Sequence, residues 1–237
     1  MENENKNSKK NIVYVAVLVL VVLAAVGSYF VFGGNGNKVS NKVVNIATVN
    51  GTVISQTTYD TQLASAIASY KTQGVDVTAS TTLSQIKTQI LNNLIDSELL
   101  IQGARVAGIK TSDADTEKQF QAILTQAGGA EGLKTALTKN NITEAELRKN
   151  ISNQLTIQAY LLANIDTKSI AVTDAEITKV YTDYSKAQKT ASSTIKVPAL
   201  KDLSPQIKQQ LVSNKEQALI ANFVAALRAK AKIETKL

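Results

Sequence analysis

The 237-residue sequence contains neither cysteine nor histidine. Without cysteine the chain has no disulfide, no thiolate nucleophile and no cysteine-ligated metal. Without histidine it lacks the commonest general base and the commonest metal ligand. Carboxylates alone could bind a metal, but no group of Asp and Glu has the spacing of a calcium loop. We therefore expect no catalytic residue, no metal site and no cofactor.

Aromatic residues are also scarce, at 5% of the chain, and tryptophan is absent. The formal net charge of +7 would suit nucleic acid or an anionic membrane surface. However, the basic residues are spread along the sequence, and no aromatic platform for stacking bases accompanies them. We therefore expect solvated basic faces and no nucleic-acid partner.

One long hydrophobic run lies near the N-terminus. Ile12 to Phe32 carries no charge and would be about 31 Å long as a helix, which matches a bilayer core. Residues 1–11 are polar and hold three lysines, which favours a cytoplasmic N-terminus. Ala25-Val26-Gly27 loosely resembles a cleavage site, but the run continues beyond the usual length of a cleaved signal. We predict a retained single-pass anchor in the cell membrane at residues 12–32, a linker at 33–42 and an extracytoplasmic remainder.

The most apolar helical pattern outside that run extends from Leu83 to Ile109. Up to Gln89 the apolar residues follow one side of the helix, and from Ile90 onward they follow several sides. Gly108 with an apolar residue behind it suits a left-handed C-cap. We predict that this helix is the hub around which other helices pack.

Local signals place the remaining elements. Two β-branched runs around Asn50-Gly51 predict a hairpin with a type I′ turn. A last long helix should begin at Ser204-Pro205, and the segment from Ala231 to Glu234 could pair with the hairpin. Residues 185–200 show no clear helical period and are interpreted as a linker. Other helices are predicted to begin at four capping residues, Ser55, Ser112, Thr143 and Thr173.

The order of these segments resembles the N-terminal chaperone module of the SurA and PrsA family of extracytoplasmic peptidyl-prolyl isomerases, which is related in fold to the substrate-binding region of trigger factor. The resemblance is carried by VNIATVNGTVIS, ILNNLIDSELLIQGARVAGI, TSDADTEKQF, ITEAELRKNISNQLTIQAYL and VTDAEITKVYTDY. The segment LSPQIKQQLVSNKEQALIANFVAALRAKAKIE is similar to the family's returning C-terminal helix and strand. The resemblance implies a mainly α fold. This fold is a SurA N-terminal or trigger-factor-like helical module with a small β-hairpin, preceded by one transmembrane helix. The module would comprise residues 43–184 and 201–237.

The sequence departs from the catalytic members of that family at residues 185–200. Those members carry a parvulin domain between the two corresponding helices. A domain with its own core needs at least about 50 residues, which is far more than residues 185–200 provide. Parvulin sites are also built with histidines, which this chain lacks. We therefore expect no isomerase activity and no other enzymatic activity.

The resemblance implies a membrane-anchored, ATP-independent chaperone that binds unfolded or nascent secreted polypeptides between its helical lobes. The alternatives are a noncatalytic interaction scaffold at the membrane, and a prolyl isomerase expected only through the family. Plain core packing competes with binding for every apolar candidate, because apolar stripes on helices usually face a core. The candidate peptide-binding residues are Phe120, Ile123, Leu124, Tyr160, Leu161, Tyr181 and Tyr184.

Overall fold

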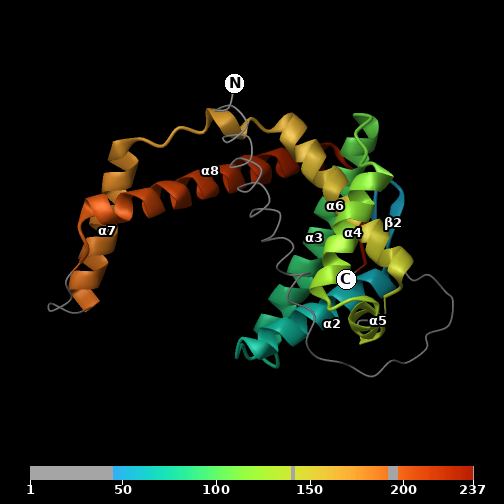
Figure 1. Cartoon of the computed structure of the whole chain (residues 1–237). Helices are drawn as coiled ribbons and strands as arrows, with labels where there is room; N and C mark the ends of the chain where they lie inside the picture. Colours follow the sequence, from blue (N-terminus) through green and yellow to red (C-terminus); the bar gives the residue numbers. More distant parts are fainter. Residues whose placement is uncertain (1–44, 140–141, 192–196, 237) are drawn as a thin grey trace. The chain divides into compact units, whose positions relative to one another are not determined.

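The computed structural model describes residues 45–139, 142–191 and 197–236 (Figure 1). The predicted cytoplasmic segment, anchor and linker at residues 1–11, 12–32 and 33–42 lie outside the described residues. The described part is mainly helical, with seven α-helices, one 3₁₀ turn and one three-stranded sheet. Within it, no helix combines the length and apolar character needed to cross a bilayer. The chain divides into two compact units, here called unit 1 (the residues up to Leu161 and from Val224 onward) and unit 2 (Leu162–Phe223).

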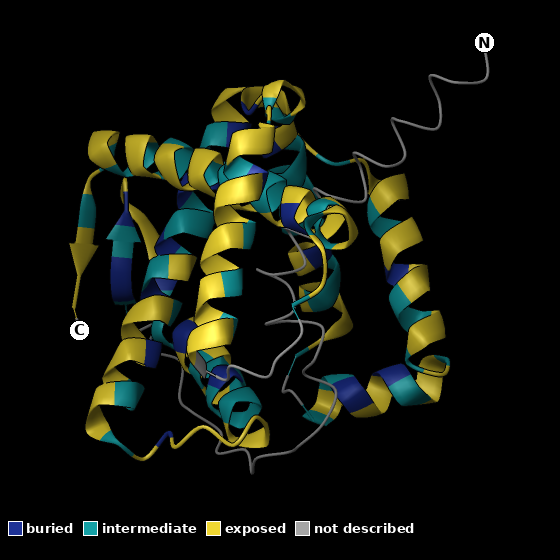
Figure 2. Cartoon of the chain, turned by 90° about the vertical axis from the view of Figure 1, so that its left-hand side faces the viewer, coloured by how far each residue is buried: buried dark blue, intermediate teal, exposed yellow. Residues whose placement is uncertain are grey.

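The sheet of unit 1 joins the two ends of the described chain. Strands β1 (Asn45–Val49) and β2 (Thr52–Ser55) form the predicted hairpin, and positive φ angles of 50° at Asn50 and 84° at Gly51 confirm its type I′ turn. Strand β3 (Ile233–Thr235) pairs antiparallel with β1, so the strand order is β2-β1-β3. Figure 2 shows the buried β1 beside the more exposed β3, close to the C-terminus. The predicted return of the last segment to the hairpin is therefore confirmed.

Helix α2 (Gln56–Thr72) follows the hairpin directly, and Ser55 caps it by accepting a hydrogen bond from the Thr58 N–H at 3.1 Å. Helix α3 (Ser80–Val106) is the predicted hub, although it begins three residues before Leu83. It ends as expected: Gly108 has a φ of 69°, and the Ile109 N–H donates to the Ala104 carbonyl at 2.8 Å. This pattern of bonds is a Schellman cap.

The burial of α3 follows the predicted change along its length. Its first half buries Ile86 against Ala66 and Val77 in a small cluster. Its second half contributes Leu91, Ile95 and Leu99 to the main core, together with Ile46, Ala47, Val49, Ile54 and Tyr59. The last turn differs from the prediction, because Val106 is 90% exposed. The helix has passed the edge of the core at that point.

A third cluster lies between α4 (Asp113–Gln126), α5 (Ala130–Lys139) and α6 (Glu144–Asn164). Ser112 caps α4, and a reciprocal pair of bonds between Thr143 and Glu146 caps α6. Gly128 and Gly129, both with positive φ, separate α4 from α5. The cluster buries Phe120, Leu133 and Ile151.

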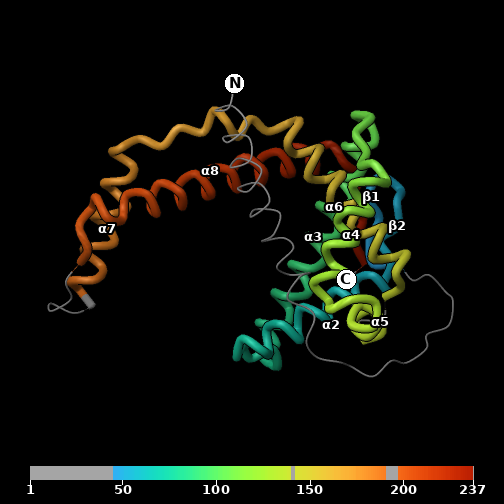
Figure 3. The backbone as a smooth tube through the Cα atoms, in the orientation of Figure 1, coloured from blue at the N-terminus to red at the C-terminus, as the bar shows by residue number. Residues whose placement is uncertain are grey.

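Unit 2 contains the 3₁₀ turn η1 (Thr167–Ser169), α7 (Asp174–Ala191) and α8 (Leu200–Lys230) up to Phe223 (Figure 3). Two sequence-based boundaries were wrong. Helix α7 continues seven residues into the predicted linker (185–191), because this segment consists mostly of good helix formers and buries too little to show an apolar stripe. Helix α8 begins at Leu200, where the Ala199 carbonyl accepts the N–H groups of Asp202 and Leu203, so Pro205 lies inside the helix. The predicted division at 43–184, 185–200 and 201–237 therefore does not coincide with the two units.

Candidate functional site

Three of the predicted binding residues, Phe120, Ile123 and Leu124, come together on α4. Phe120 is only 3% exposed and lies inside the α4–α6 cluster, while the other two are half-buried at its edge. In this structure Phe120 is thus a core residue, which is the packing alternative that the sequence left open.

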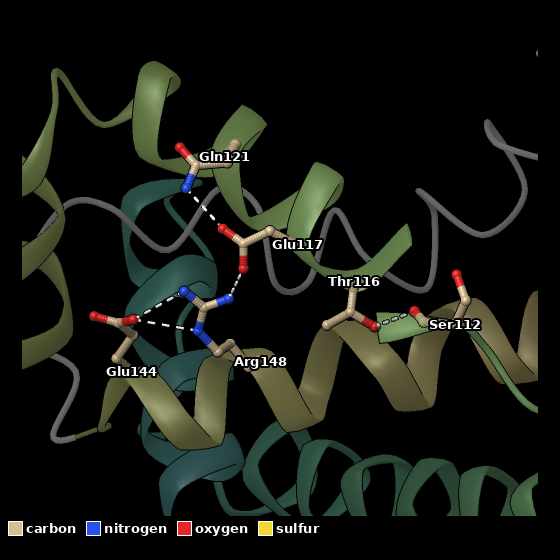
Figure 4. A network of polar contacts seen from close by, with 6 residues as sticks. All are labelled: Ser112, Thr116, Glu117, Gln121, Glu144 and Arg148. Atoms are coloured by element: carbon tan, nitrogen blue, oxygen red, sulfur yellow. Dashed lines mark hydrogen bonds and ion pairs between the residues drawn. The ribbon is translucent and has the colours of Figure 1, made fainter. Parts of the chain in front are cut away.

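The side chain of Arg148 covers Phe120 from α6. Its guanidinium carbon lies 3.6 Å from the centroid of the Phe120 ring, a cation–π contact. The guanidinium also forms ion pairs with Glu117 of α4 and, at 3.1 Å, with Glu144 one turn earlier on α6 (Figure 4). Hydrogen bonds from Gln121 and then Arg148 lower the pKa of Glu117. Arg148 therefore holds α4 against α6 with polar groups, so this side of the cluster is not an apolar binding surface.

Tyr160 and Leu161 near the end of α6 are also buried. A methyl group built on Gly103 of α3 would lie 2.5 Å from the Tyr160 hydroxyl oxygen, so the Tyr160 ring contacts the α3 backbone directly. This close approach explains why α3 has glycine at that position. Both residues are buried rather than lining an open surface, and Tyr160 packs against α3 within unit 1.

Tyr181 and Tyr184 belong to unit 2. The Tyr181 hydroxyl donates to the Pro198 carbonyl at 2.9 Å and thereby joins α7 to the chain before α8. Tyr184 is 40% exposed. The seven candidates therefore do not share one surface in unit 1 or unit 2, and a binding role for Tyr181 and Tyr184 stays a prediction.

Exposed large apolar side chains are more frequent in unit 2 than in unit 1 among the described residues. Among the described residues, four of the seven large apolar residues that are exposed lie in this unit: Leu162 (48%), Val180 (37%), Tyr184 (40%) and Leu219 (39%). The other three, Val53, Val75 and Val106, are distributed over unit 1. Val180 and Tyr184 are one helical turn apart on α7, a spacing that could have been noticed in the sequence.

Two glutamates of unit 2 have opposite electrostatic environments. Glu176 on α7 accepts a 2.7 Å ion pair from Lys215 of α8, whose ammonium also donates to the Ala171 carbonyl at 2.6 Å. The bond from Lys215, followed by bonds from Thr173, lowers the pKa of Glu176 to about 2. Glu216, the next residue on α8, is buried, and its burial raises its pKa. The sequence analysis did not single out Glu216, because the burial of this residue depends on the tertiary fold.

A shallow open depression on α3 is lined by uncharged polar residues, Ser84, Gln85, Thr88, Gln89 and Asn92. No group of three acidic side chains that could hold a metal ion occurs among the described residues.

The family of the chain follows from a comparison of its sequence with known protein families. The sequence model of the family described as SurA-like N-terminal domain matches residues 1–161. The chain belongs to this SurA-like family. The matched region ends at the residue where the first part of unit 1 ends. Membership supports a chaperone role in general, because SurA-like chaperones bind unfolded polypeptides.

Other similarities are more distant. No curated protein matches the chain. A solved structure from a report on PEB4 and Cj1289, described there as two structurally related SurA-like chaperones of Campylobacter jejuni, is 13% identical over 81% of this chain and 98% of that chain. Its TM-score is 0.49, a level from which nothing is inferred about this protein.

Proposed function

We propose that this SurA-like protein is a membrane-anchored, extracytoplasmic, ATP-independent holdase for unfolded secreted polypeptides. The observation that supports this role is the exposure of Leu162, Val180, Tyr184 and Leu219 in unit 2. Apolar side chains left in water are available to contact the apolar segments that an unfolded chain exposes. Holding such segments apart needs no nucleotide and no catalytic group.

The test is the suppression of aggregation of an unfolded model protein by the full-length chain in detergent micelles, followed by light scattering. We expect suppression at an equimolar ratio. A variant with Val180→Ser, Tyr184→Ser and Leu219→Ser should lose most of this effect, since it removes exposed apolar groups without opening a core. Val53→Ser with Val106→Ser is the matched control, because it removes exposed apolar side chains from unit 1 and should leave suppression unchanged. An inactive wild-type chain would overturn the proposal.

We further propose that the protein is not a prolyl isomerase. Only residues 192–199 lie between α7 and α8, which is far too short for a catalytic domain of at least about 50 residues. Uncatalysed isomerisation takes tens to hundreds of seconds, so catalysis would be easy to detect in a proline-limited refolding assay. Acceleration of that refolding would contradict this part of the proposal.

The membrane location is part of the same proposal and depends on the uncharged run from Ile12 to Phe32. The chain should remain in the membrane fraction after alkaline carbonate extraction, and added protease should digest the part beyond residue 33 from the outer side. Release of the chain by carbonate would contradict a retained anchor. In-cell crosslinking would distinguish a holdase from a scaffold, because a holdase should capture many unrelated secreted chains and a scaffold one partner.

A further inference from the structure

Glu216 is the one charged residue that is buried among the residues the structure describes, with 5% exposure. It lies on α8 within unit 2. No described residue forms a hydrogen bond or ion pair with its carboxylate, and burial is the sole cause of its raised pKa. The preceding residue shows the contrast, since Lys215 is paired with Glu176 at 2.7 Å.

A buried carboxylate without a partner is energetically unfavourable, because it loses its hydration and gains no opposite charge. Neither of its oxygens is fully enclosed, however, since Ser185 Oγ is the side-chain oxygen in the described structure that is both enclosed and without a partner. Glu216 therefore has a carboxylate that still touches solvent on a side chain that is otherwise covered.

Apolar side chains flank this carboxylate on its own helix. Val212 and Ile220 lie one turn before and after Glu216 and are half-buried, and Leu219 is 39% exposed. A lysine or arginine has the complementary form, with a long apolar stem and a cation at its end. Such a side chain could place its stem against this apolar face and its charge at Glu216.

We propose that Glu216 receives a lysine or arginine side chain of a bound unfolded polypeptide. Helix α8 then selects client segments in which a basic residue is flanked by apolar residues. This proposal rests on the proposed holdase function, and it adds the chemical class of the segment that is bound.

The experiment uses the full-length chain in detergent and three fluorescent peptides that differ only in the central residue of an apolar segment. The central residue is lysine, norleucine or glutamate, and binding is followed by fluorescence anisotropy. We expect the lysine peptide to bind about tenfold more tightly than the norleucine peptide, as a hydrogen bond to a charged group implies. The glutamate peptide should bind most weakly.

Three variants assign the preference to Glu216. Glu216→Gln keeps the size of the side chain and should bind the lysine and norleucine peptides equally. Glu216→Lys should reverse the order and favour the glutamate peptide. Asp202→Asn is the matched control, because Asp202 is an exposed carboxylate on the same helix and its loss should leave the preference intact. Circular dichroism should show that each variant retains its helices.

Each outcome has a separate meaning. Equal binding of the lysine and norleucine peptides by the wild-type chain would overturn this proposal and leave the holdase function standing. A preference for lysine that persists in Glu216→Gln would also overturn it. Absence of binding to all three peptides, together with absence of aggregation suppression, would overturn the proposed function itself.

Discussion

Units 1 and 2 are built from similar helices but bury very different amounts of apolar side chain. Unit 1 has three core clusters: two include residues of α3, the larger of them together with residues of the sheet, and the third lies between α4, α5 and α6. In unit 2 the buried apolar residues are Ile165, Ile177 and Ile207 among those described. The stability of this protein should therefore reside in unit 1, whereas the apolar side chains available for binding should reside in unit 2.

The first prediction tests this difference with core truncations and should give the largest effect. Ile95→Ala removes a side chain from the main core of unit 1 and should lower the free energy of unfolding by about 2–5 kcal/mol. Ile177→Ala should cost less, because a lightly packed pair of helices can collapse around the missing group. Urea denaturation followed by circular dichroism measures both. Val106→Ala is the control and should change the free energy by less than about 0.5 kcal/mol.

Equal losses for Ile95→Ala and Ile177→Ala would contradict the comparison. They would mean that unit 2 is packed as firmly as unit 1, and its exposed apolar residues would then need another explanation.

The second prediction concerns α8, which belongs to both units. Arg228, near its end in unit 1, forms an ion pair with Asp96 of α3 and donates to the Asn92 carbonyl at 3.0 Å. Arg228→Ala should cost about 1–3 kcal/mol of unfolding free energy, because these partly buried partners lose a charged hydrogen bond. A double-mutant cycle with Asp96→Asn should show coupling between the two side chains. Strictly additive effects would show that the pair does not hold α8.

The third prediction uses the same capping device in both units. Thr143→Ala and Thr173→Ala each remove the hydroxyl that accepts the N–H of Glu146 or Glu176, while the backbone N–H of the replaced residue can still donate to the glutamate. Each change should cost about 0.5–2 kcal/mol locally. In Thr143→Ala this loss should appear in the global unfolding of unit 1. In Thr173→Ala it should appear as faster hydrogen exchange within α7, because helices with few buried contacts open locally.

If both substitutions lowered global stability equally, unit 2 would have to unfold together with unit 1. That result would remove the distinction between a stable unit and a locally opening one.

The smallest effect should be the pH dependence of unit 2, where Glu176 and Glu216 act in opposite directions. The pKa of Glu176 is about 2 in the folded chain and 4.5 when unfolded, so its contribution is present above pH 4.5 and is lost as pH falls toward 2. The pKa of Glu216 is raised above 4.5, so its contribution is present below pH 4.5 and is lost as pH rises through the folded value. Hydrogen exchange of α7 and α8 at a series of pH values measures the sum.

The two substitutions separate these contributions. Glu176→Gln should abolish the loss of protection at acid pH, and Glu216→Gln should abolish the loss on the neutral side. Unchanged pH profiles in both variants would show that neither carboxylate is linked to the folding of unit 2.

The sequence predicted best those features that depend on neighbouring residues. The type I′ turn at Asn50-Gly51, the caps at Ser55 and Thr143, and the Schellman end after α3 all use groups within a few positions of one another. The dense packing around the second half of α3 was also predictable, because a helix that is apolar on several sides must be covered on several sides.

The candidate binding residues were less predictable, because an apolar stripe shows which face is covered but not by what. Phe120 was proposed as a binding residue, yet Arg148, 28 residues later, covers it. The burial of Glu216 likewise depends on the tertiary fold, which no local pattern specifies. The continuation of α7 to Ala191 was missed for the opposite reason, since an exposed helix leaves no apolar period to detect.

The pairing of β1 with β3 also has a consequence for the folding of the protein during its synthesis. Val49 and its partner Ile233 are separated by roughly 180 residues. At a synthesis rate of about 5–20 residues per second, β3 is made roughly 10–40 s after β1. Throughout that interval one edge of β1 is unpaired and can recruit strands from neighbouring nascent chains. A protein that we propose protects unfinished chains must therefore pass through the same vulnerable stage itself.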